Sequence, residues 1–284
     1  MIQLTDDLIK DAFVKTGVDE SFFPVYERKI KQAYDELQQD SPDDEHTTDE
    51  ESNVFGSIRQ ANNYIAYYTE EIEKGHSDCW AVSFAEYRDT CDDIHETALE
   101  AYDSIEDKAQ REKDLDIYIN SLSDDIIFRE RYKYLFQDFD LHPREKAAEY
   151  CEIYHRCIKA GKSAIYAHAF ANEANNYFDE RGTHYNELFV DIHAEAVEQA
   201  IEHGMDEDRA YSFGECCSDV CANGSWWMTR NYLNEYHEDW QKEFFLYLAN
   251  KDYKHYKKCD MPEDELNDLW REIYKRGFGK VAQF

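Results

Sequence analysis

Residues 158–171 read IKAGKSAIYAHAFA, and closely similar stretches stand at residues 72–85 (IEKGHSDCWAVSFA) and 201–214 (IEHGMDEDRAYSFG). Each has an isoleucine, a glycine three residues later, and then Ala and Phe at the same offsets. Glycine closes helices because it adopts the left-handed backbone conformation without a steric penalty. A Ser or Asp two residues after it can cap the next helix through its side-chain oxygen. The three stretches therefore predict three turns, each joining two antiparallel helices.

The spacing of these turns indicates a repeat. Gly75, Gly161 and Gly204 are 86 and 43 residues apart, which predicts a period of about 43 residues with degenerate turns near Asn120 and Asn250. Two helices of roughly 18 residues plus turns fill such a period, a length typical of HEAT and armadillo units, although no consensus of those repeats is matched. Strand-type alternation is absent from the sequence. We expect an all-α fold, an array of antiparallel αα-hairpins.

A polar stretch near the N-terminus divides the chain into three parts. Residues 1–39 are expected to form an N-terminal helix pair, and residues 53–284 the helical repeat body. Between them, residues 40–52 read DSPDDEHTTDEES and contain no apolar residue except the proline, which predicts an acidic linker or loop. Further helix boundaries are expected at the following prolines and glycines: Pro24, Pro143, Pro262, Gly182 and Gly277.

The charge of the chain limits its partners. It has 63 Asp and Glu against 31 Lys and Arg, a formal net charge of −32. Such a charge disfavours direct binding to nucleic acid or to an anionic membrane, and favours a basic protein partner, for example a nucleic-acid-binding protein. Because 42% of the residues are hydrophobic and 15% aromatic, the chain is expected to fold rather than to remain disordered.

Signals for export or membrane insertion are missing from the sequence. Residues 1–7, MIQLTDD, lack the basic and apolar regions of a signal peptide, and the longest apolar run, residues 244–249, is too short to span a bilayer. The eight cysteines are scattered along a chain that is large enough to fold without disulfides. We therefore expect reduced thiols and a cytoplasmic location.

Candidate catalytic and metal-binding patterns are weak. Glu152 and His155 have the Glu-x-x-His spacing of di-iron bundles, yet no second pair of equal quality accompanies them. Cys216, Cys217 and Cys221 lack the Cys-x-x-Cys spacing of zinc sites and fit the buried side of a helix. Phosphate-binding loops and nucleophile motifs are absent. We expect no metal, no cofactor and no enzymatic activity, and a helical metalloenzyme remains the third hypothesis.

Two rows of acidic residues follow helical spacing, with steps of 4, 4, 3 and 4. Like charges at these spacings repel one another along a helix, and neither row has a Lys or Arg within it to relieve the repulsion. If the 43-residue period is strict, a turn falls near Glu96 and splits the second row. The first acidic row comprises Glu187, Asp191, Glu195, Glu198 and Glu202; the second comprises Asp92, Glu96, Glu100, Asp103 and Asp107.

These rows lead to the functional hypotheses. Carboxylates one helical turn apart are separated by about 5–6 Å, a spacing similar to that of phosphates along a nucleic-acid strand. The first hypothesis is therefore a non-enzymatic interaction protein that binds a basic partner, in its sharpest form a nucleic-acid mimic that inhibits a nucleic-acid-binding defence enzyme. The alternative is an adaptor or scaffold that binds a protein or peptide in an aromatic groove. The acidic rows can also be interpreted without any function, as the solvated faces of an acidic protein.

Overall fold

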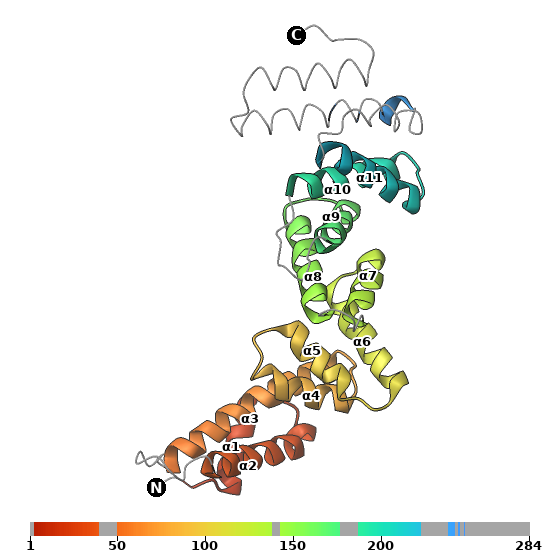
Figure 1. Ribbon diagram of the computed structural model, residues 1–284. Helices are drawn as coiled ribbons and strands as arrows, with labels where there is room; N and C mark the ends of the chain where they lie inside the picture. The colour runs from red at the N-terminus through yellow and green to blue at the C-terminus, as the bar shows by residue number, and fades with distance from the viewer. Residues whose placement is uncertain are drawn as a thin grey trace, which may run out of the picture. The chain divides into compact units, whose positions relative to one another are not determined.

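A computed structural model describes residues 3–39, 50–137, 143–176, 187–222 and 238–241, together with Phe244 and Tyr247. Every regular element in these ranges is a helix (Figure 1), so the all-α prediction is confirmed. The elements are α1 (Asp6–Thr16), η1 (Glu20–Phe22), α2 (Phe23–Gln39), α3 (Glu50–Glu73), α4 (Asp78–Arg88), α5 (Ile94–Asp103), α6 (Lys108–Leu122), α7 (Ile126–Gln137), α8 (Pro143–Lys159), α9 (Ala164–Asn176), α10 (Glu187–Glu202) and α11 (Glu207–Ala222). No helix among them is both long and apolar enough to cross a membrane.

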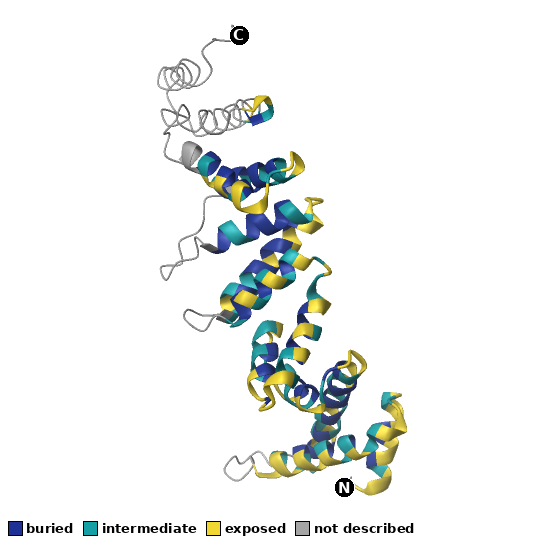
Figure 2. Cartoon of the chain, turned by 90° about the vertical axis from the view of Figure 1, so that its right-hand side faces the viewer, coloured by how far each residue is buried: buried dark blue, intermediate teal, exposed yellow. Residues whose placement is uncertain are grey.

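The chain divides into two compact units, Met1–Arg144 and Glu145–Phe284. In the first unit, α1 and α2 share one hydrophobic core with α3 and α4, built around residues such as Phe13, Tyr26 and Ile65. Figure 2 shows the buried faces turned toward neighbouring helices and the exposed residues on the outer faces. Within the expected acidic linker, residues 40–49 lie outside the described residues and residues 50–52 begin α3.

The three predicted glycine turns have the same local structure. Gly75, Gly161 and Gly204 have φ of 93°, 83° and 86°, and each lies two residues after the end of a helix. Each glycine N–H donates to the carbonyl of the preceding isoleucine at 2.9–3.0 Å, and the next N–H donates to the carbonyl five residues before it at 3.0–3.1 Å. This pair of bonds defines a Schellman motif. The next helix is capped in each case as predicted, by the side-chain oxygens of Ser77, Ser163 and Asp206.

The shared Ala and Phe positions after each turn are packing positions. Ala81, Ala167 and Ala210 have no exposed surface, which allows neighbouring helices to approach closely. The phenylalanines three residues later, Phe84, Phe170 and Phe213, are at most 6% exposed. The shared Ala and Phe residues are therefore the ones that pack against neighbouring helices.

The regular period is not confirmed. Asn120 was expected at a degenerate turn, but it lies inside α6, and the helix continues to Leu122. An additional short helix, α5, stands between α4 and α6 and alters the spacing of the turns. Of the other predicted boundaries, Pro24 lies at the second residue of α2 and Pro143 begins α8. The expected boundaries at Gly182, Asn250, Pro262 and Gly277 lie outside the described residues.

Candidate functional site

The first acidic row lies on a single helix, as its spacing predicted. Helix α10 begins at Glu187 and ends at Glu202, the two ends of the row. Asp191, Glu195 and Glu198 are half-buried, whereas Glu202 is exposed. The side chain of Glu187 lies outside the description. We call Asp191, Glu195 and Glu198 the α10 row.

Each carboxylate of the α10 row accepts a hydrogen bond from a hydroxyl group of another segment. Tyr166 of α9 donates to Asp191, and Ser163, the N-cap of α9, donates to Glu198. Tyr247 donates to Glu195 at 3.1 Å. Burial raises the pKa of Tyr166, and the adjacent Asp191 carboxylate raises it further, so this phenol stays protonated and remains a donor. The α10 row is thus held in place by its neighbours.

Asp191 lines a groove of about 300 Å³ among α8, α9 and α10. Figure 1 shows these helices within the same part of the chain. Two cations of the α8–α9 segment, Arg156 and Lys162, also line it, and the Lys162 Nζ lies 4.0 Å from the centre of the Tyr166 ring. Phe170 and Leu188 add apolar surface. We call this the basic-rimmed groove.

The other two carboxylates of the row line a second groove of about 320 Å³. Glu195, Glu198 and Gln199 form its α10 side, and Phe244 and Tyr247 also line it. The Phe244 and Tyr247 ring centres are 5.7 Å apart, at an interplanar angle of 31°. We call this the acidic groove, because Glu195 and Glu198 are the charged residues among the described part of its lining.

The second acidic row does not lie along one helix, and it is not broken at Glu96, where a strict 43-residue period would place a turn. Asp92 precedes α5, which carries Glu96, Glu100 and Asp103, and Asp107 is the N-cap of α6. The physical reason lies in the caps, because Asp93 and Asp107 have the extended backbone of N-cap residues and therefore cannot lie inside a continuous helix.

Capping contacts give local roles to acids in this row and beside it. Asp93, next to Asp92, accepts hydrogen bonds from the N–H groups of His95 and Glu96, and Asp107 of the row accepts from those of Ala109 and Gln110. The Glu96 carboxylate itself pairs with Arg144 at 2.6 Å. The second row therefore contains capping and ion-pairing residues rather than a continuous stripe.

In the part of the chain that the structure describes, no third metal ligand accompanies the candidate pair. Glu152 and His155 are exposed on α8. Among the described residues, no three His, Cys, Asp or Glu side chains come together in a way that could hold a metal ion. Cys217 is fully buried and Cys216 is half-buried, while the side chain of Cys221 is outside the description. Cys217 thus fits the expected role of a thiol on the buried side of a helix.

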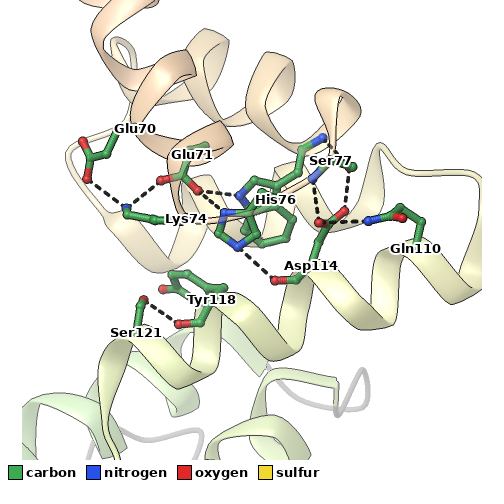
Figure 3. A network of polar contacts seen from close by, with 10 residues as sticks. Glu70, Glu71, Lys74, His76, Ser77, Gln110, Asp114, Tyr118 and Ser121 are labelled. Carbon is green, nitrogen blue, oxygen red and sulfur yellow. Dashed lines mark hydrogen bonds and ion pairs between the residues drawn. The ribbon is translucent and has the colours of Figure 1, made fainter.

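The first unit contains a buried polar network that no pattern in the sequence had indicated (Figure 3). His76 places Nδ1 2.7 Å from a Glu71 carboxylate oxygen and Nε2 3.1 Å from the main-chain oxygen of Asp114. Both of these neighbouring oxygen atoms only accept hydrogen bonds. Burial raises the pKa of Glu71, but the hydrogen bonds from His76 and Lys74 outweigh it and lower the pKa below its ordinary value.

The same network links the α3–α4 turn to α6. The Asp114 carboxylate accepts from the Ser77 N–H at 2.8 Å and from its hydroxyl at 2.6 Å, and the Trp80 indole N–H donates to Glu71 at 2.8 Å. Its two buried carboxylates, Glu71 and Asp114, each accept several hydrogen bonds, as buried charged groups require. We assign it to the stability of the first unit, and retain the α10 row with its two grooves as the candidate site.

Comparison with known proteins gives no relative from which a function could be transferred. No family model matches the chain, and no characterised protein or solved structure matches it.

Proposed function

We propose that the protein is a non-enzymatic interaction protein that binds a basic segment of a protein partner along α10. One observation carries this proposal: the α10 row places three carboxylates on one helical face, and they line two grooves that also contain aromatic side chains. Carboxylates supply charge recognition, and the aromatic rings supply apolar contact area.

The surroundings of the α10 row suit it to binding. Asp191, Glu195 and Glu198 are half-buried, so their attraction for a cation is less screened than that of exposed carboxylates. Hydroxyl groups already orient all three, which lowers the entropy lost when a partner is bound. The net charge of −32 steers a basic partner toward the chain.

Nucleic-acid mimicry is the second candidate. It is favoured by the net charge and by the spacing of the row, about one carboxylate for each turn of helix. A mimic needs its carboxylates to face the partner as a row, whereas these three are half-buried among aromatic side chains. That arrangement favours insertion of individual basic side chains into grooves, the adaptor-like form of the hypothesis. We also propose a reducing, cytoplasmic setting, which the free thiols of Cys79, Cys91, Cys151 and Cys157 support.

Amide hydrogen exchange with a basic probe tests the proposal. A short peptide containing several Lys and Arg residues is titrated into the full chain, and a peptide of the same sequence with norleucine and citrulline in their places is the control. The proposal predicts that the basic peptide alone slows exchange in α10 and in the first turn of α9. Protection confined to the first unit, or equal protection by both peptides, contradicts it.

A further inference from the structure

We infer that one side of helix α7 is a second interaction surface, which binds an acidic segment of a partner protein that also carries apolar side chains. The surface comprises Ile126, Glu130 and Tyr134, with Arg129 and Arg131 beside them, and we call it the α7 face. It lies in the first unit, so the inference goes beyond the proposed function and does not depend on the α10 row.

The α7 face contains apolar side chains that the fold leaves exposed. Ile126, Glu130 and Tyr134 are four residues apart, so they lie one above the other along one side of the helix. Ile126 is 62% exposed and Tyr134 is 59% exposed, whereas Phe128 and Tyr132, on the opposite side, have no exposed surface. A surface helix normally turns its large apolar residues toward the core. Two of them left outside, two turns apart, therefore indicate a contact surface.

The charge of α7 is opposite to that of the whole chain. Its 12 residues contain two arginines and a lysine against one glutamate, the largest excess of basic residues in any helix that the structure describes. The chain has a formal net charge of −32. Charge complementarity therefore favours a partner with carboxylates at α7, in contrast to the basic partner that we propose for α10.

The two arginines keep their charges available for such a partner. Arg129 donates to the uncharged side-chain oxygen of Asn120 at 3.0 Å, and the Arg131 guanidinium lies 5.3 Å from the centre of the Tyr134 ring. Within the ranges that the structure describes, neither arginine pairs with a carboxylate, whereas Lys133 of the same helix pairs with two carboxylates of α6. Stacking on the ring also holds the Arg131 guanidinium beside the exposed apolar surface.

The arrangement of these groups defines the chemistry of the partner. Arg129 lies three residues after Ile126, and Arg131 lies three residues before Tyr134, so each exposed apolar side chain has an arginine as its neighbour. Ile126 and Tyr134 are about 12 Å apart along the helix axis. A segment with carboxylates beside apolar side chains can pair with the guanidinium groups and cover the apolar surface at once.

The net charge of the chain does not prevent this contact at physiological ionic strength. Exposed charges farther apart than about 8 Å are then largely screened from one another. The partner segment therefore responds mainly to the charges next to it, which are the two arginines and Glu130.

The test uses a fluorescent, capped peptide in which aspartates flank leucine and phenylalanine residues. One control peptide has asparagine in place of aspartate, and the other has serine in place of the apolar residues. Fluorescence anisotropy at physiological ionic strength gives the affinity of each for the full chain, and chemical-shift changes locate the bound peptide. We expect the acidic apolar peptide to shift resonances of α7, and each control to bind at least about fivefold more weakly.

Three charge variants follow from the α7 face. Arg129→Gln with Arg131→Gln should weaken binding of the acidic apolar peptide about fivefold, since two ion pairs are lost. Lys10→Gln with Lys15→Gln is the matched control, because it makes the same change in net charge at exposed positions of α1 and should have little effect. Glu130→Gln removes the one acid of the face and should tighten binding.

An apolar variant tests the other half of the face. Ile126→Ser with Tyr134→Ser should weaken binding about tenfold, because less apolar surface is covered in the complex. Val14→Ser is its control, since Val14 is 75% exposed on α1 and should not contribute. All of these positions are exposed or half-buried, and circular dichroism checks that each variant is folded.

Three outcomes would overturn the inference. Equal losses in the two arginine and lysine variants would show that the peptide responds only to net charge. Peptide-induced shifts that lie outside α7 would place the contact elsewhere. Shifts in α7 that appear when the chain alone is concentrated would make a second copy of the chain the occupant. None of these results bears on the binding of a basic segment along α10, which has its own probe.

Discussion

Tyr166 of α9 donates its hydroxyl hydrogen to Asp191 of α10, and this bond joins the two helices. Tyr166 is 3% exposed and Asp191 is half-buried, so the hydrogen bond between them is largely shielded from water. The same bond that fixes the candidate site therefore also stabilises the second unit.

Replacing Tyr166 by Phe removes this donor and keeps the ring. We expect the free energy of unfolding to fall by about 1–2 kcal/mol, because a half-buried carboxylate loses its hydrogen bond. Tyr34→Phe is the matched control, since the Tyr34 hydroxyl accepts its hydrogen bond from Gln38 at an exposed position. Urea denaturation followed by circular dichroism measures both. Equal losses in the two variants would show that the Tyr166 bond has no special role.

The buried histidine of α10 predicts a dependence of stability on pH. His193 is 1% exposed, and burial lowers its pKa to about 4, whereas the unfolded chain has the ordinary value of about 6.5. Above pH 6.5 the ring is neutral in both states. As the pH falls from about 6.5 to about 4, the unfolded state binds the proton first, so stability is lost across this window, by up to roughly 3 kcal/mol.

Replacing His193 by Leu should remove this part of the pH dependence. The difference in unfolding free energy between variant and unaltered chain is measured at pH 7 and at pH 4.5, and the variant is expected to lose less stability between them. His203→Gln, at an exposed position, should follow the unaltered chain. A pH profile of His193→Leu parallel to that of the unaltered chain would contradict the assignment.

The polar network around His76 predicts losses of stability that differ in size between its variants. His76→Leu leaves the buried Glu71 carboxylate without one of its partners, and we expect this substitution to destabilise the first unit by about 3 kcal/mol. Lys74→Met removes an exposed partner of the same carboxylate and should cost less, about 1 kcal/mol.

The double variant Glu71→Leu with His76→Leu removes both polar partners of this contact and should recover part of the loss. Hydrogen exchange in the α3–α4 turn and in α6 locates the effect. A double variant that loses the sum of both single effects would show that the two side chains do not act as a pair.

Three Gly→Ala substitutions separate backbone strain from crowding. Gly75→Ala meets no atom within 4 Å, so its cost of about 1 kcal/mol comes only from the positive φ. Gly56→Ala lies in α3 and approaches only the flexible end of Leu37 at 3.0 Å, so helix propensity should make it neutral or slightly stabilising. Gly214→Ala would place Cβ 2.7 Å from a Val197 methyl carbon and should destabilise. Thermal denaturation ranks the three, and the reverse order for Gly56 and Gly214 would overturn this explanation.

The parts of the fold that could be predicted are those fixed by neighbours in the sequence. The turn at Gly161 depends on bonds that reach five residues at most, so a Gly followed by a Ser cap was enough to identify it. The irregular spacing of the turns could not be predicted in the same way, because the residues that repeat at the three glycine turns do not indicate the extra helix α5 between α4 and α6. Helical spacing placed the α10 row on one helix, since that requires only the geometry of one element.

The partners of the candidate site lay beyond such reasoning. Asp191 and Glu198 are bonded by residues 25 and 35 positions away, and Glu195 by one 52 positions away. His76 and Asp114 are 38 positions apart. No local pattern links such pairs, so the row was predicted as a face of charges, while its burial and its hydroxyl donors became visible only in the packed helices.

The most direct test of the proposed function neutralises the α10 row without removing its hydrogen-bond acceptors. The variant Asp191→Asn, Glu195→Gln, Glu198→Gln retains an amide oxygen for each hydroxyl donor, so it should fold like the unaltered chain. Its control, Asp11→Asn, Asp35→Asn, Glu106→Gln, makes the same change in net charge at exposed positions of the first unit. The quantity to measure is the dissociation constant of the basic peptide at low and at physiological ionic strength. We predict that the α10 variant weakens binding by at least about tenfold at both, while the control loses affinity only at low salt. Equal losses in the two variants at both ionic strengths would contradict a binding site on α10.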